Sequence, residues 1–242
     1  MTAIRLKVPP TRRVTDALLV IVSTLIGLSL FGQFAKHIYG HTMLKGFVPT
    51  FYVDLESSVP TWYSSVALAA AGGLLLVIAA AKLKAKDKYR WHWATLGSLF
   101  VLLSIDEIAM IHELPIEPLR ERLDAGGLLY YTWVIPGAVL VLLVSFCYLR
   151  FFLSLPRRTQ ALLLLAGATF VSGAIGVEML SGAQADRFGE ENLDYALIVT
   201  LEEFLEMLGV VVLIRCLLEY IESSLGAMQI QFVRDETVRA IR

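Results

Sequence analysis

Charged residues are scarce in this chain of 242 residues: they make up 18% of it, against about 25% in a typical soluble domain. Hydrophobic residues make up 57%. This balance argues against a soluble globular protein and indicates that a lipid bilayer surrounds much of the chain. The net charge of −1 carries little information, because acidic and basic residues are separated along the sequence.

Other absences narrow the function. The sequence has no basic stripe with interleaved aromatic residues, so we expect no nucleic-acid partner. It also lacks a Ser-His-Asp pattern, a phosphate-binding loop and a dinucleotide fingerprint. Its two cysteines, Cys147 and Cys216, fall in helix halves expected to face the cytoplasm, which argues against a disulfide framework. No Glu-x-x-His occurs, which argues against a ferritin-like di-iron centre.

What is present is a series of six long apolar stretches, each able to supply the roughly 20 helical residues that cross a membrane core. They cover approximately residues 16–38, 62–82, 91–113, 129–153, 160–181 and 196–220. The connections are short, and neither a second domain nor an internal repeat is visible. We therefore predict an all-α polytopic membrane protein, with residues 1–242 forming one transmembrane domain of six helices.

Lysine and arginine are unevenly distributed between the connections. Sixteen of the 21 lie in or near the two terminal segments, the second–third connection and the fourth–fifth connection. The opposite side has only Lys36, Lys45, Arg120, Arg122 and Arg187. The positive-inside rule therefore predicts that both termini lie in the cytoplasm.

The ionisable residues within the predicted helices are the main functional signal. The third helix contains them in SIDEIAMIHE, the fifth in GAIGVEML, the sixth in TLEEFLEMLG, and the first ends on Lys36 and His37. In this topology all of these segments reach the outer third of the bilayer, because three helices end there and the sixth begins there. The inner halves have almost no ionisable residues. The sequence therefore predicts an acidic, outward-facing site.

Charge makes that site unusual. An ionised side chain costs about 2.5–3.5 kcal/mol at the centre of a membrane helix, and only Lys36 is a well-placed basic partner. The charge must be relieved by retained protons, by entering water or by bound cations. The acidic residues concerned are Asp106, Glu107, Glu178, Glu202, Glu203 and Glu206.

A divalent metal site is the leading hypothesis, with Fe, Mn or Zn as the ion. The predicted ligands are Glu178, Glu202, Glu206, Asp106, His112 and His37. Glu107, Glu113 and Glu203 are predicted to act as bases or as hydrogen-bond partners of the ligands. A metal-bound water could attack a lipid or another membrane-accessible small molecule, but the sequence leaves open whether the protein is an enzyme.

Two other classes of function stay open. The first is a proton- or cation-coupled transporter, since carboxylates in membranes often line ion paths; the apolar inner halves argue against it. The second is a structural subunit of a membrane complex, with protonated acids linking helices. The outer loop 39–61 could cover the site and add oxygens from Asp54 and Glu56, or simply lie at the membrane interface. The oligomeric state is also left open.

At SIDEIAMIHE, TLEEFLEMLG and DLESSVPTWYSS the sequence resembles a family of bacterial multipass membrane proteins with DE-x4-HE and EE-x2-EM-x-G motifs. The resemblance spans most of the chain. It implies a multi-pass protein of the bacterial inner (cytoplasmic) membrane and brings no activity with it. Alkaline-ceramidase-like hydrolases share the His-x-x-x-His spacing of HIYGH, but their pair lies on the last of seven helices, so we assign no membership.

Overall fold

The computed structural model describes residues 10–225 and is all-α over that range, which confirms the predicted helical class. Five basic residues used to predict the orientation lie outside the described residues: Arg5, Lys7, Arg234, Arg239 and Arg242. The long helices are α1 (Thr11–His37), α3 (Val59–Lys84), α4 (Arg90–Ala109), α6 (Val134–Leu153) and α9 (Leu193–Ser224). A further long helix runs through α7 (Arg157–Val171), the π-helical η3 (Ser172–Val177) and α8 (Glu178–Phe188).

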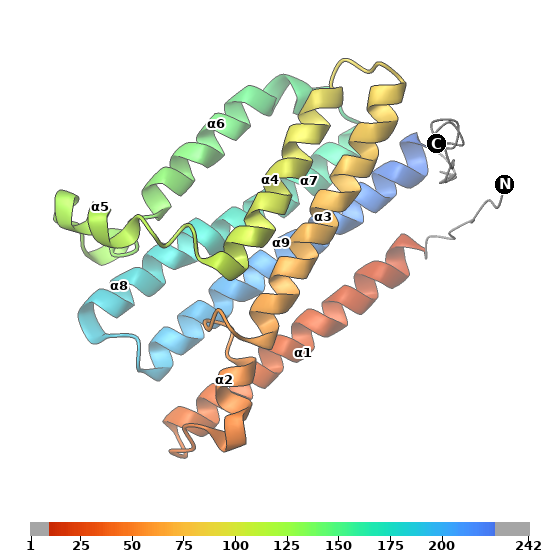
Figure 1. The fold of residues 1–242 in the computed structure, drawn as a ribbon. Coiled ribbons are helices and arrows are strands. Elements are labelled where there is room, and N and C mark those ends of the chain that lie inside the picture. Colours follow the sequence, from red (N-terminus) through yellow and green to blue (C-terminus); the bar gives the residue numbers. More distant parts are fainter. Residues whose placement is uncertain (1–9, 226–242) are drawn as a thin grey trace, which may run out of the picture.

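Short helical segments lie between the long ones. They are η1 (Leu44–Gly46), α2 (Phe47–Phe51), α5 (Ile116–Leu123) and η2 (Gly127–Leu129). In Figure 1, α2 lies beside the end of α1, whereas α5 projects beyond the end of the bundle. These segments therefore belong to the end of the molecule at which α1 and α4 finish.

Four helices are long and apolar enough to cross a membrane: α1, α3, α6 and the continuous α7–α8 helix. The helices α4 and α9 are also long, but charged residues, mainly acidic, interrupt their apolar sequences. The surface is apolar where a soluble protein would be polar, with Phe146 80%, Leu142 69% and Leu164 65% exposed. A surface of this kind is typical of contact with lipid, so the structure indicates a membrane protein.

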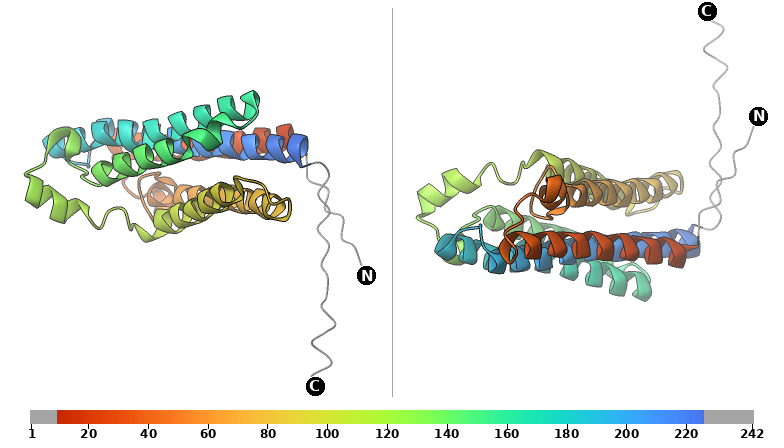
Figure 2. Two further views of the ribbon diagram at one scale, coloured as in Figure 1. Left: turned by 90° about the horizontal axis from the view of Figure 1, so that it is seen from above. Right: turned by 90° about the horizontal axis from the view of Figure 1, so that it is seen from below.

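The helices pack in two layers around α9. Helix α9 contacts α1, α3 and α7, and α3 packs along α4. Figure 2 shows α3 and α4 together on one side, facing the layer that contains α1, α9 and the α7–α8 helix. Leu75, Ile78 and Leu217 are completely buried between these layers. The interior of one half of the bundle is thus closely packed and apolar.

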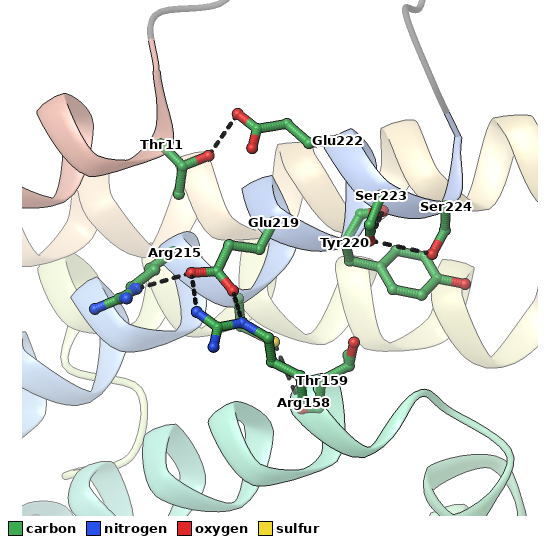
Figure 3. A network of polar contacts seen from close by, with 10 residues as sticks. Thr11, Arg158, Thr159, Arg215, Glu219, Tyr220, Glu222, Ser223 and Ser224 are labelled. Carbon is green, nitrogen blue, oxygen red and sulfur yellow. Dashed lines mark hydrogen bonds and ion pairs between the residues drawn. The ribbon is translucent and has the colours of Figure 1, made fainter.

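The bundle has a basic end, formed by the start of α1, the α3–α4 and α6–α7 connections and the last turns of α9. Here Glu219 accepts hydrogen bonds from Arg158, at 2.6 and 3.0 Å, and from Arg215, at 3.0 Å (Figure 3). The Thr11 hydroxyl donates to Glu222 at 2.7 Å, so the described ends of α1 and α9 meet at this end. We call the opposite end, where α1 and α4 finish and α9 begins, the acidic end.

Helix bounds differ from the sequence prediction at the acidic end. Helix α4 ends at Ala109, four residues before the predicted limit, because Met110 adopts a left-handed conformation with φ 51°. Helix α9, the sixth predicted helix, starts close to its predicted limit. The fifth predicted helix extends to Phe188 and contains a π-helical segment at Ser172–Val177. His37 and His41 do not share a helix, because α1 ends at His37 and Gly40, with φ +71°, precedes the exposed His41.

Close contact between helices depends on glycine at several positions. A Cβ at Gly209 of α9 would lie 2.8 Å from the backbone nitrogen of Phe170 in α7. The same holds between α3 and α4, where a Cβ at Gly72 would lie 3.0 Å from the Gly97 carbonyl oxygen. Small residues of this kind allow helix backbones to approach each other in membranes.

The α3–α4 contact gives a paired test. We expect Gly72→Ala to lower the free energy of unfolding by about 1–3 kcal/mol, because the added methyl group forces backbones apart. Gly73→Ala, at the next position, has open space around its Cβ and should be neutral or slightly stabilising. Thermal unfolding in detergent measures both, and equal stability of the two variants would contradict the packing described.

Candidate acidic site

The π-helical segment η3 is what brings the acidic residues of α8 and α9 together. A Cβ at Gly173 would lie 2.7 Å from the Glu202 carbonyl oxygen and 3.2 Å from the Glu206 backbone nitrogen. Only glycine therefore permits this contact. The widened turn then leads directly into α8, whose first residue is Glu178. π-Helical turns of this kind are frequently found at functional sites.

Glu178 and Glu202 form the centre of the site. The carboxyl group of Glu178 interacts electrostatically with that of Glu202. The Ser181 hydroxyl donates to Glu202 Oε2 at 2.9 Å, and the Trp133 indole N–H donates to Glu178 Oε1 at 3.0 Å. Glu202 is only 6% exposed. Two carboxyl groups this close are stable only when a proton or another cation lies between them.

Two more acids of α9 extend this centre towards α4. Glu206 interacts electrostatically with Glu107 and Glu178, and Glu203 interacts with Glu206 and Glu107. All of them are at least half-buried. We call Glu107, Glu178, Glu202, Glu203 and Glu206 the carboxylate cluster.

A small cavity of about 10 Å³ lies beside the cluster, between α3, α4, α7 and α9. Glu107 and Glu206 line it, together with Ser64, which is 8% exposed and whose hydroxyl has no hydrogen-bond partner within residues 10–225. This volume suits one water-sized occupant. A buried hydroxyl without a partner is uncommon, so this cavity is a place where a small polar ligand would be stabilised.

Asp106 and His112 form a separate pair at the end of α4. Asp106 accepts from the His112 backbone N–H at 2.8 Å, and its other oxygen lies 2.9 Å from His112 Nδ1. The left-handed Met110 turns the chain back and makes this contact possible. A helix continued through residue 113 would put Asp106 and His112 on different faces, but α4 has already ended at Ala109.

The loop after α2 adds two further acids near the cluster, Asp54 and Glu56. Glu203 interacts electrostatically with both of them. Burial raises the pKa of Glu56 to about 7, with the negative charge of Glu113 adding to the effect. Burial also raises the pKa of Asp54 to about 6, although hydrogen bonds from Tyr52 and Tyr195 lower it in part. The loop thus adds to the negative charge of the site.

The raised pKa values predict pH-dependent order of this loop. The folded state binds protons at Asp54 and Glu56 more tightly than the unfolded chain does, so their contribution to stability is present below about pH 4 and is lost as the pH rises through 6–7. We therefore expect backbone amides of residues 52–58 to exchange faster at pH 8 than at pH 5 after correction for intrinsic rates. Hydrogen exchange with mass spectrometry measures this, and Glu56→Gln should reduce the difference. Equal protection at both pH values would contradict it.

Within residues 10–225, no basic side chain forms an ion pair with a member of the carboxylate cluster, although His112 interacts electrostatically with Glu107. Lys36 forms an ion pair of 2.6 Å with Glu191, and His112 is bound to Asp106. The charged neighbours of His37 are Lys36 and Glu191, so His37 does not join the cluster. Over residues 10–225, no three His, Cys, Asp or Glu side chains stand close enough together to hold a metal ion in the observed arrangement.

The structure therefore brings together most of the residues that the sequence singled out. Glu107, Glu178, Glu202, Glu203 and Glu206 lie in one cluster, whereas Asp106 and His112 pair beside it and Glu113 is exposed. Their roles as ligands or bases stay predictions. Trp133 and Ser64 were missed: Trp133 carries the signal of an interfacial aromatic residue, and a serine in an apolar helix gives no signal of its own.

Comparison with known proteins places the chain in a family. The model of the family described as Domain of unknown function (DUF8692) matches residues 13–220, so the chain belongs to that family. The match includes the carboxylate cluster and all six long helices, apart from a few terminal residues of α1 and α9. No curated protein and no solved structure matches the chain.

Proposed function

We propose that this protein is a cation-binding protein of the bacterial inner membrane. In this proposal its six long helices all cross the bilayer, the basic end faces the cytoplasm, and the acidic end opens to the outer side. The carboxylate cluster holds protons in the arrangement described above. It exchanges them for one divalent metal ion, for which Fe, Mn and Zn are the candidates.

The proposal depends on one observation: the Glu178 and Glu202 carboxyl groups interact with each other, and within residues 10–225 neither forms an ion pair with a basic side chain. The donors that reach this pair, Ser181 and Trp133, are neutral. They orient the oxygens but supply no positive charge. A cation must therefore balance the pair, and a proton is the smallest that can do so.

The unpartnered Ser64 hydroxyl supports the same conclusion independently. It lines the small cavity with Glu107 and Glu206, so three oxygen-bearing side chains from three helices surround one space. Oxygen ligands of this kind suit a hard or borderline divalent cation. The absence of a preformed group of three ligands means that binding must draw carboxylates together, most simply Glu178, Glu202 and Glu206.

The packing below the cluster favours a site with one entrance over a transport path. Leu75, Leu213 and Leu217 are buried between the cluster and the basic end. An ion path across the membrane would need polar side chains or water there. A bound divalent ion would instead provide an activated water at the outer side, where Glu107 or Glu203 is close enough to act as its base.

Elemental analysis of the purified protein tests the proposal. We expect about one divalent metal ion per chain after purification at neutral pH without chelator, and loss of that ion in Glu202→Ala. Glu222→Ala, on the same helix at the basic end, is the matched control and should keep the ion. Wild-type protein that contains no stoichiometric metal, even after incubation with Mn²⁺, Fe²⁺ or Zn²⁺, would contradict metal binding.

A further inference from the structure

A polar groove lies at the basic end, between the first turns of α1, the first turns of α7 and the last turns of α9. Its volume is about 1030 Å³. Because α1 and the α7–α8 helix are long enough to cross a membrane and both begin at this groove, it lies at the level of a membrane surface. The charged residues that line it are three arginines and three acids: Arg12, Arg158, Arg215, Asp16, Glu219 and Glu222.

The groove uses the side of α9 that faces away from the apolar core. Arg215, Glu219 and Glu222 follow one another at intervals of four and three residues, so they share one side of the helix. Leu217, which is completely buried between the two helix layers, lies on the opposite side. The charged side chains therefore face the surroundings of the bundle, where lipid headgroups and water reach them.

One part of the groove is suited to a phosphate group. Glu219 accepts hydrogen bonds from both Arg158 and Arg215, so one carboxylate holds two guanidinium groups side by side (Figure 3). Among the described residues, Arg158 donates through Nε and one Nη atom, and Arg215 donates through Nε alone. Both side chains therefore keep N–H donors for a further ligand. Guanidinium groups recognise phosphate oxygens with two parallel hydrogen bonds.

The helix starts at the groove favour the same group. Helix α1 begins after Pro10 and α7 after Pro156, and neither start has a side-chain cap or an acidic residue in its first turn. Uncapped first turns carry partial positive charge and bind phosphate. Thr159, in the first turn of α7, lines the groove and is only 7% exposed. Its hydroxyl forms no hydrogen bond with the described residues (Figure 3) and is a further donor for a ligand here.

A neighbouring part of the groove is suited to an ammonium group. Glu222 accepts a hydrogen bond from the neutral Thr11 hydroxyl at 2.7 Å, and it forms no ion pair with a basic side chain within residues 10–225. Glu222 follows Glu219 by three residues on α9, so their Cβ atoms are about 5–6 Å apart. This is similar to the separation that two carbons set between the phosphate and ammonium groups of phosphoethanolamine.

We propose that this groove binds a phospholipid whose headgroup carries both a phosphate and a primary ammonium group, as in phosphatidylethanolamine. Arg158, Arg215 and the start of α7 hold the phosphate, and Glu222 holds the ammonium group. The equal numbers of arginines and acids favour this ligand, because a zwitterion leaves the charge balance of the groove unchanged. A purely anionic headgroup would instead lie against the acids without a compensating charge. The groove is at the opposite end from the carboxylate cluster, so this inference does not depend on metal binding.

Native mass spectrometry of the full-length protein in detergent tests the site. Phosphatidylethanolamine and phosphatidylglycerol with the same acyl chains are titrated separately, and the affinity for the first lipid is measured. We expect the wild type to bind phosphatidylethanolamine about fivefold more tightly or better, since only this lipid offers an ammonium group to Glu222. Arg158→Gln should lower the affinity for phosphatidylethanolamine by about tenfold, because it removes two donors and a charge. Arg157→Gln is the matched control and should bind as the wild type does, because Arg157 is also exposed but does not line the groove.

Two further measurements separate the parts of the site. Glu222→Gln keeps the acceptor for the Thr11 hydroxyl and should bind both lipids equally, because it loses only the contact with the ammonium group. Inorganic phosphate at millimolar concentration should not displace the lipid; displacement would identify a site for the free ion and overturn the lipid site. Equal affinity of the wild type and Arg158→Gln for phosphatidylethanolamine would also overturn it, as would an unchanged lipid preference in Glu222→Gln.

Discussion

We expect Gly173→Ala to have the largest effect on both stability and the acidic site. The added methyl group would lie 2.7 Å from the Glu202 carbonyl oxygen and 2.9 Å from Glu206 Cγ. A backbone oxygen cannot rotate away, so η3 must move from α9. We predict a loss of about 1–3 kcal/mol in the free energy of unfolding. The same shift would separate Glu178 from Glu202 and abolish metal binding.

The neighbouring glycine of the same π-helical segment is the control. A Cβ at Gly176 meets no atom within 4 Å, so Gly176→Ala should unfold at the wild-type temperature or slightly above it and should keep the metal ion. Circular dichroism during heating and metal analysis measure the two effects. A Gly173→Ala variant with wild-type stability and wild-type metal content would show that η3 does not need to touch α9.

The second large effect is expected at Glu206, where a neutral replacement should increase stability but remove metal binding. We expect Glu206→Gln to raise the free energy of unfolding at pH 9 by about 1–3 kcal/mol, because it removes a negative charge that no basic side chain balances. The gain should be smaller near pH 5, because carboxylates are more readily protonated there. Stabilising substitutions that impair function are typical of strained binding sites, so the variant should also lack the metal binding that we propose.

Glu222→Gln is the matched change on the same helix, at the basic end. It keeps the acceptor for the Thr11 hydroxyl and should alter stability by less than about 0.5 kcal/mol at either pH. Unfolding in denaturant at the two pH values measures both variants. A Glu206→Gln protein that is less stable than wild type at pH 9 would mean that Glu206 is held by a favourable interaction, as a structural role predicts.

The sequence predicted the helical architecture well because long apolar runs and short connections leave few alternatives. It also predicted that acids from α4, α8 and α9 meet, since depth follows from counting residues along each helix. Six crossings and the orientation of the termini stay predictions.

Other parts of the site depend on backbone geometry that periodicity does not contain. The left-handed Met110 ends α4 early and turns His112 back to Asp106. The π-helical turn at Ser172–Val177 changes the register at which Glu178 faces Glu202. The hydrogen bond from Trp133 to Glu178 joins residues 45 positions apart, and nothing in either local sequence indicates it. The same is true of the contacts of the Tyr131 hydroxyl with Glu190 and with the Tyr195 hydroxyl.

Calorimetric titration with Mn²⁺ in two buffers of different ionisation enthalpy directly tests whether the carboxylate cluster exchanges protons for a divalent metal ion. We predict that one ion binds per chain at pH 7, with a buffer-dependent heat that corresponds to release of at least one proton. Glu202→Gln should show no binding. Binding without proton release would contradict a cluster balanced by protons. No binding heat in the wild type, in either buffer, would contradict the cation site itself.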